Sequence, residues 1–315
     1  MRNMLNYGNA LEFYSSWDSP VVIISDGPYG ISGYDGDLKS ESNLSSWYEP
    51  HIIEWAKIST ALTTLWFWNT EVGWAEVHPV LKKHGWIYRS CNIWDKGIAH
   101  IAGNCNTKTM RKFPVVTEVC AHYIRKPEFF VGKDVALSAQ DWLRKEWKRA
   151  GLTLNQANIA CGVKNAASRK YLTHDHLWYF PPAEMFECLS RYANTHGNQE
   201  YTPYFSLNGD IISGSQWERL RAKFYCPVGK TNVWYIPSVK GAERLKIDGK
   251  IAHPNQKPKT INDMLISCSS DVDDVVWEPF GGTCSASLSA KNLGRKFHAS
   301  EINLETYLLA KSILE

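Results

Sequence analysis

The sequence predicts an α/β protein with a doubly wound, mostly parallel sheet and an inserted, mainly helical module. Residues 21–24 are four β-branched side chains in a row, which is typical of a parallel strand covered on both faces. Strand-like and helix-like segments then alternate up to residue 125, as in doubly wound sheets. Long helical stretches replace this alternation from Lys133, and the alternation returns after His253.

The elements expected in the first part of the chain follow from composition and breaker residues. Residues 31–46 are rich in Gly, Ser and Asp and predict a loop. Pro50 suits the first turn of the next helix, and Lys82 and Lys83 suit the last turn of the one after it, where cations complement the helix dipole. The predicted order is strand 21–24, helix 49–59, strand 63–68, helix 73–85, strand 86–94 and strand 115–125.

The middle of the chain predicts helices separated by glycine turns. Gly151 ends an amphipathic helix at 141–150, and Thr153 with Gln156 three residues later predicts a capped second helix. With a third helix at 165–171 this pair resembles a helix-turn-helix, a pattern that any helical hairpin with a glycine turn shares. Whether the pair contacts DNA is therefore open at this point.

Regular elements return after an irregular stretch at 197–250 that ends in a basic, hairpin-like segment. A strand, a glycine turn, a helix and a further strand then form one half of a doubly wound sheet. The expected elements are helix 259–267, strand 274–277, helix 284–293, strand 296–300 and a last helix from Asn303.

Bulk composition bounds the class of protein. The chain has 315 residues, 44% of them hydrophobic and 21% charged, which suits a globular protein with one large core and a smaller module. We expect a cytoplasmic protein, because no apolar stretch reaches the ~18–20 residues that cross a bilayer and the N-terminus lacks a signal-peptide pattern. The eight cysteines are scattered without a Cys-x-x-Cys pair, so neither a zinc site nor a disulfide framework is predicted.

The formal net charge of +3 is unevenly distributed. Residues 133–250 hold 17 lysines and arginines against 11 aspartates and glutamates, a net charge of +6, and the rest of the chain carries −3. A basic module in a slightly acidic protein favours a polyanionic partner that contacts this module. A chance excess of charge on a solvated surface is the alternative.

The first chemical motif follows the strand at 21–24. Asp26-Gly27-Pro28-Tyr29 places a carboxylate, main-chain carbonyls and an aromatic ring at the end of a buried strand, where α/β sheets bind ligands. Taken alone, Asp26 could cap a helix and Tyr29 could be a core aromatic. The motif becomes informative only with a second one far downstream.

The second motif is the turn Glu278-Pro279-Phe280-Gly281-Gly282 between a strand and a helix. Glycines let backbone amides approach a ligand closely, and Glu301 at the end of the next strand can accept from both hydroxyls of a ribose. The chain has no Gly-x-Gly-x-x-Gly and no lysine phosphate cradle. A ribose-bearing cofactor without a pyrophosphate therefore fits better than NAD. Glu301 as a plain surface residue is the alternative.

With these motifs the chain resembles the β class of DNA amino-methyltransferases. The family's catalytic Asp-Pro-Pro-Tyr is similar to residues 26–29, its cofactor turn Asp-Pro-Phe-Gly-Gly-Ser-Gly is similar to residues 278–284, and its His-x-x-Gln-Lys-Pro is similar to residues 253–258. The order, catalytic motif first and cofactor turn last, is peculiar to this class. The chain departs from the pattern at Gly27, which replaces a proline, and at Glu278, which replaces an aspartate.

The resemblance implies a methyltransferase core, residues 1–132 and 251–315, around a DNA target-recognition module, residues 133–250. It implies S-adenosylmethionine as cofactor, double-stranded DNA as partner, a cognate restriction endonuclease as possible second partner, and a monomer or homodimer. The residues it assigns to catalysis are Asp26, Gly27, Pro28 and Tyr29, and those it assigns to the cofactor are Asp26, Gln256, Lys257, Glu278, Pro279, Phe280, Gly281, Gly282 and Glu301. Gln256 and Lys257 as mere helix-capping residues are the alternative.

The implied reaction explains why these residue types stand there. The exocyclic amine of a base is a poor nucleophile, and two acceptors, the Asp26 carboxylate and the carbonyl of Gly27 or Pro28, can draw on its hydrogens. Tyr29 is expected to stack on a base flipped out of the duplex.

Asp26 favours adenine N6 as target, because family members that modify cytosine N4 more often carry Ser there, and Ser25 keeps cytosine N4 open. Methylation of RNA or protein, and a catalytically silent DNA-binding protein, are further alternatives.

Overall fold

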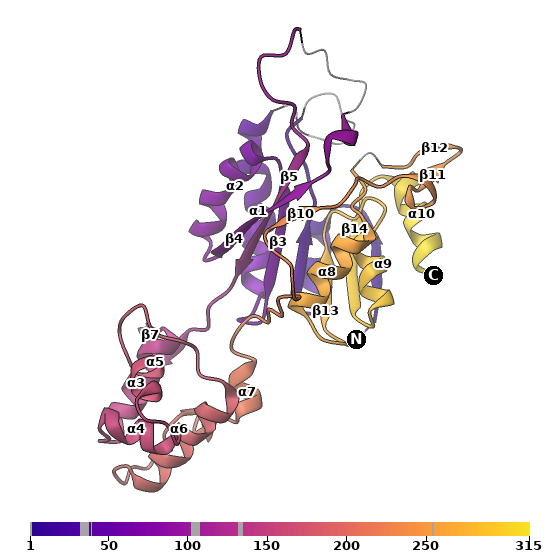
Figure 1. Cartoon of the computed structure of the whole chain (residues 1–315). Coiled ribbons are helices and arrows are strands. Elements are labelled where there is room, and N and C mark those ends of the chain that lie inside the picture. The colour runs from indigo at the N-terminus through magenta and orange to yellow at the C-terminus, as the bar shows by residue number, and fades with distance from the viewer. Residues whose placement is uncertain (1, 32–37, 39, 102–107, 132–134, 254) are drawn as a thin grey trace. The chain divides into compact units, whose positions relative to one another are not determined.

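The computed structural model describes residues 2–31, 38, 40–101, 108–131, 135–253 and 255–315. The chain forms two compact units, which we describe separately (Figure 1). The first unit contains residues 1–125 and 222–315, and the second contains residues 126–221. The sequence placed the module boundaries at 133 and 250, so the inserted unit is shorter at its C-terminal end than the sequence predicted.

The first unit is built on an eight-stranded sheet in the order β1-β14-β13-β2-β3-β5-β4-β10. Only β5 runs antiparallel to its neighbours, so the predicted doubly wound, mostly parallel sheet is confirmed. The strands are β1 Met4–Tyr7, β2 Val22–Ser25, β3 Thr64–Asn69, β4 Ile87–Asp95, β5 Thr117–Ile124, β10 Val233–Tyr235, β13 Val275–Glu278 and β14 Lys296–Glu301.

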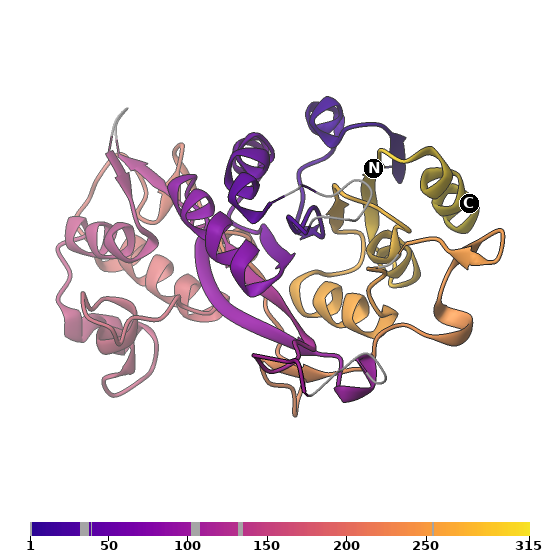
Figure 2. The same cartoon turned by 90° about the horizontal axis from the view of Figure 1, so that it is seen from above.

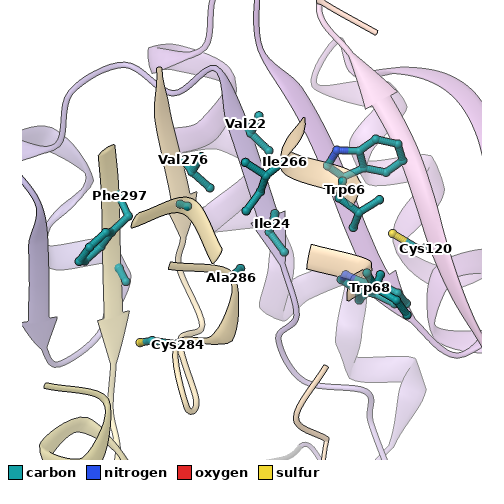
Figure 3. Packing of buried hydrophobic residues seen from close by; sticks show 14 of the residues in the cluster. Val22, Ile24, Trp66, Trp68, Cys120, Ile266, Val276, Cys284, Ala286 and Phe297 are labelled. Carbon is teal, nitrogen blue, oxygen red and sulfur yellow. The ribbon is translucent and has the colours of Figure 1, made fainter. Parts of the chain in front are cut away.

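Helices cover both faces of this sheet (Figure 2). Because successive side chains of a strand point to opposite faces, Val22 and Ile24 of β2 pack with α8, α9 and α10, while Ile23 packs with α1 and α2. Figure 3 shows the first of these two layers, with β2 and β13 at its centre. The helices are α1 Leu44–Ile58, α2 Glu71–Lys83, α8 Lys259–Ser269, α9 Ser285–Asn292 and α10 Leu304–Leu314.

Two edge strands and one helix start differ from the sequence prediction. Strand β1 pairs with β14. Strand β10 pairs with β4, and residues 222–250 thereby belong to the first unit. Both strands have three or four residues, too few for a reliable alternation pattern. Helix α1 begins at Leu44 instead of residue 49, because buried Leu44 and Tyr48 extend its apolar face across the expected loop.

The second unit is mainly helical, with its own core of buried aromatic and aliphatic residues around Trp142, Phe186 and Trp217. Its elements are β6 Phe129–Val131, β7 Val135–Leu137, α3 Ala139–Arg149, α4 Leu154–Ala160, α5 Ala166–Tyr171, α6 Ala183–His196, β8 Ser206–Leu207, β9 Asp210–Ile211 and α7 Gly214–Glu218. Throughout the part of the chain that the structure describes, no helix combines the length and the apolar character needed to span a bilayer.

Candidate active site

The two motifs meet at one edge of the sheet. Strands β2, β13 and β14 are parallel neighbours, so their carboxyl ends, and with them Asp26, Glu278 and Glu301, lie along the same edge. Gly27 comes so close to the cofactor turn that a Cβ at this position would lie 2.7 Å from Cδ2 of Phe280. The third motif lies there too, because the His253 ring is 3.6 Å from the position of a Cβ on Gly282.

Gly27, the first departure from the family pattern, has a steric reason. A Cβ at position 27 would also lie 2.6 Å from the hydroxyl of Tyr48, which is fully buried. That hydroxyl donates to the Pro28 carbonyl at 3.1 Å, so it has little freedom to withdraw. A proline at position 27 carries a Cβ and would need Tyr48 and Phe280 to move. The glycine therefore suits the side chains packed around it.

Asp26 is held by Lys257, a residue 231 positions away in the sequence. The ammonium of Lys257 donates to both oxygens of Asp26 at 2.7 Å. Lys257 is 3% exposed, and its ammonium lies 5.1 Å from the centre of the Trp68 ring and 5.4 Å from that of Tyr29. The carboxylate is thus fixed in orientation at the tip of β2.

Glu118 at the start of β5 completes a buried charge cluster. Its carboxylate lies 3.3 Å from the Lys257 ammonium and forms a second ion pair with Lys96. Burial lowers the pKa of Lys257, but Asp26 and Glu118 raise it more, so the amine stays charged. Burial raises the pKa of Glu118, but Lys257 and Lys96 lower it more, so this carboxyl stays ionised.

Tyr29 belongs to the same cluster. Its hydroxyl lies 2.8 Å from Asp26 Oδ1 and 3.0 Å from Glu118 Oε2, and the side chain is 3% exposed. Burial and the two carboxylates hold the pKa of Tyr29 well above its usual value, so the hydroxyl remains a donor. In this structure the ring is packed in the core, whereas stacking on a base requires an open ring face.

The two candidate carbonyls, those of Gly27 and Pro28, differ in their hydrogen bonds. The carbonyl of Pro28 accepts from Tyr48 at 3.1 Å and from the Asn69 amide at 3.0 Å, so both of its acceptor positions are engaged. Within the described residues, no donor engages the carbonyl of Gly27.

Backbone and carboxylate contacts shape the cofactor turn. The N–H of Gly281 donates to the Ser300 carbonyl at 2.8 Å, and the Ser300 hydroxyl donates to the Pro279 carbonyl at 2.8 Å. Glu301 accepts from the N–H of Gly282 at 2.6 Å and from that of Asn303 at 2.7 Å. A carboxylate has about four acceptor positions, so Glu301 keeps capacity for two hydroxyl donors.

Glu278 caps the helix after the turn. Its two oxygens accept from the N–H of Ala286 at 3.1 Å and of Ser287 at 2.6 Å, in the first turn of α9. Burial raises the pKa of Glu278 to about 7, against the lowering effect of these donors. Both oxygens are engaged by the protein, so Glu278 orders the turn.

Gln256 connects the third motif to the segment before the β11 (Lys246–Ile247) and β12 (Lys250–Ile251) hairpin. Its amide oxygen accepts from the N–H of Leu245 at 3.0 Å, and its amide nitrogen donates to the Glu243 carbonyl at 2.8 Å. The side chain is therefore engaged by the backbone at 243–245, while its neighbour Lys257 reaches Asp26.

Four residues of the site were not assigned from the sequence: Tyr48, Asn69, Lys96 and Glu118. Glu118 could have been suspected, because a carboxylate in a strand of otherwise mostly buried residues needs a partner of opposite charge. Nothing in the sequence identified Lys257 and Lys96 as the partners.

The fold is shared with solved DNA methyltransferases. The crystal structure of the M1.HpyAVI–SAM complex matches 99% of this chain and 98% of its own, with a TM-score of 0.54 at 14% identity. PvuII DNA methyltransferase, described as cytosine-N4-specific, matches 100% of this chain and 87% of its own, with a TM-score of 0.56 at 11% identity. These likenesses place the chain in the methyltransferase fold class.

The chain belongs to the DNA methylase family, because the N6/N4 methyltransferase family model matches residues 21–312. The type II methyltransferase M.ScaI of Streptomyces caespitosus is 37% identical over 95 residues, which are 29% of this chain and 31% of that relative. The match thus spans less than a third of the length of that curated relative.

Proposed function

We propose that this protein transfers a methyl group from S-adenosylmethionine to the exocyclic amino nitrogen of a base flipped out of duplex DNA. One observation carries the proposal: the Asp26 motif and the glycine turn contact each other, with Gly27 against Phe280. The site also fits the cofactor, because Glu301 lies half-buried beside the turn and retains acceptor positions for ribose hydroxyls. Phe280 and the turn's backbone complete the proposed cofactor site, with Gly281 and Gly282 allowing close approach.

S-adenosylmethionine, when bound, supplies a methyl group on a positively charged sulfur. Asp26 and the Gly27 carbonyl accept the two hydrogens of the amine and orient its nitrogen toward that methyl. As the nitrogen forms the new N–C bond, the electrons of the broken C–S bond remain on sulfur and one N–H proton leaves through Asp26. Lys257, Tyr29 and Glu118 keep the carboxylate in position during this step.

We propose adenine N6 as the target, on the strength of Asp26 in the first motif position. Cytosine N4 is the second candidate, and Ser25 directly before Asp26 supports it. Single-molecule sequencing of DNA from cells that express the chain gives the modified base and its sequence context together. N6-methyladenine supports the first assignment, and N4-methylcytosine the second.

We also propose that the protein is the protective half of a restriction-modification pair in the cytoplasm, acting as a monomer or homodimer. The similarity to a type II methyltransferase supports this role. Plasmid DNA methylated by the protein should then resist one restriction endonuclease that cuts the unmodified plasmid. If the methylated site matches the site of no cleaving enzyme, the protein acts outside such a pair.

Radiolabelled methyl transfer tests the function directly. Label from S-adenosylmethionine should enter plasmid DNA and neither tRNA nor protein, and Asp26→Ala should reduce the rate about 100-fold or more. Asp18→Ala is the control: it removes a carboxylate four residues before β2 that contacts His298 at 3.2 Å, and it should keep most of the rate. Full activity of Asp26→Ala would remove the mechanism, and cofactor binding by the wild type without any transfer would favour a silent DNA-binding protein.

A further inference from the structure

The second unit contains a helix pair with one buried and one open side. On the inner side, Ala157 of α4, Ala167 of α5 and Leu172 are fully buried in the core of this unit. Asn158 and Ser168 connect the two helices, because the N–H of Ser168 donates to the Asn158 side-chain oxygen at 3.0 Å and the Asn158 amide donates to the Ser168 hydroxyl at 3.1 Å. Helices α4 and α5 are therefore one rigid piece.

Residues 161–165 join these helices in a short turn that contains a glycine. Gly162 takes the left-handed conformation with φ +65°, and the space where a Cβ would be is open. Thr153 and Gln156 form a capping box at the start of α4. Helix-turn-helix motifs likewise join two helices by a short turn that often contains glycine, and their second helix enters the major groove.

Three exposed cations and an asparagine amide lie on α5 and in the turn before it. Lys164, Asn165, Arg169 and Lys170 are exposed, and the three cations form no ion pair with any described residue. The Lys170 ammonium lies 5.7 Å from the ring centre of Tyr179, which leaves its charge uncompensated. Asn165 is the N-cap residue of α5, yet its side chain makes no capping hydrogen bond. An N-cap asparagine usually directs its oxygen to the helix, so this amide is available to a ligand.

Three other arginines of the unit are engaged in contacts within the fold. Arg149 pairs with Glu146 and Glu200, Arg221 pairs with Glu218, and Arg144 donates to the Leu172 carbonyl at 2.5 Å. The net charge counted from the sequence does not single out the second unit. Six of the 17 basic residues between 133 and 250 lie at 222–250, which belongs to the first unit. Exposed cations without an ion pair to a described residue also occur elsewhere in the unit, at Arg191 and Arg219. Helix α5 differs from those places because its cations flank Asn165, whose side chain makes no capping hydrogen bond.

We propose that α5 is a DNA-reading helix that enters the major groove of the substrate duplex. An α-helix with its side chains is about 10–12 Å across, which fits a groove about 12 Å wide. Asn165 at its start faces base edges, where an asparagine amide matches adenine N6 and N7, and Lys164, Arg169 and Lys170 contact phosphates or guanine. This inference rests on the proposed function, because it takes the DNA substrate from it.

Binding of the full chain to a random-sequence duplex pool tests the inference, because such a pool contains every short recognition sequence. Arg169→Ala/Lys170→Ala should weaken binding about 10- to 100-fold and reduce the slope of log K against log salt by up to about 2. Arg191→Ala/Arg219→Ala removes two exposed cations elsewhere in the same unit and should leave binding within about 3-fold of wild type and the slope unchanged. Circular dichroism and the unfolding midpoint verify that both variants fold.

Sequencing of the bound duplexes tests the role of the amide. Asn165→Ala should erase the preference at one or two base positions and leave the others, while Asn155→Ala on α4 should leave the enriched sequence unchanged. Wild-type binding by Arg169→Ala/Lys170→Ala, or an equal loss in the control pair, would overturn the inference. Failure of the proposed function is distinguishable, because it would show as DNA binding by the wild type without methyl transfer.

Discussion

The buried ammonium of Lys257 offers the sharpest test of how the active site is held together. We expect Lys257→Met to destabilise the protein strongly, because methionine keeps much of the apolar stem and removes the charge. Asp26 and Glu118 would then face each other across the Tyr29 hydroxyl, at 2.8 and 3.0 Å from it, without a cation between them. Breaking a buried ion pair by removing one partner costs about 3–5 kcal/mol.

A double-mutant cycle measures the pair itself. Glu118→Gln keeps the shape of the side chain and removes the second negative charge, so it should recover part of the loss caused by Lys257→Met. We expect a coupling free energy of about 1–3 kcal/mol between the two changes. Urea unfolding followed by tryptophan fluorescence is a suitable assay, because the Lys257 ammonium lies 5.1 Å from the Trp68 ring centre.

The matched control is Lys259→Met, two residues further on. That lysine pairs with Asp263 at the surface of α8 and its side chain is 53% exposed, so the change should cost less than about 1 kcal/mol. A loss below about 1 kcal/mol for Lys257→Met, or effects of Lys257→Met and Glu118→Gln that simply add, would refute the assignment of Lys257 as the centre of the cluster.

Two further predictions concern Tyr29 and Glu278. Because the Tyr29 hydroxyl lies 2.8 Å from Asp26 Oδ1, Tyr29→Phe should reduce the single-turnover methylation rate nearly as much as Tyr29→Ala. A rate close to wild type for Tyr29→Phe would instead indicate that the ring stacks on a base. Because the pKa of Glu278 is about 7 in the folded protein and 4.5 is its ordinary value, the folded state holds a proton between these pH values that the unfolded state lacks. The unfolding free energy should therefore fall by up to about 3 kcal/mol as pH rises through this window, and urea titrations at about pH 5 and 8 should show a smaller fall for Glu278→Gln.

The local features of this protein could be predicted from residues that are neighbours in the chain. Four β-branched residues predicted strand β2, Thr153 with Gln156 predicted the start of α4, and the order of the motifs predicted the family. Such features depend on residues close together in the chain, where backbone geometry and side-chain type act directly.

The contacts that hold the site together join residues far apart in the chain and could not be predicted locally. The ion pair between Lys257 and Asp26 joins residues 231 positions apart, and Glu118 reaches it from the antiparallel strand β5. Short edge strands such as β10 form because a neighbouring strand edge supplies hydrogen-bond partners. The residues of β10 alone do not predict this pairing. The choice between the two candidate carbonyls likewise follows from donors supplied by α1 and β3. Local periodicity therefore predicts which segments are helices and strands. The order of the strands determines which side chains come into contact, and packing of the whole core sets that order.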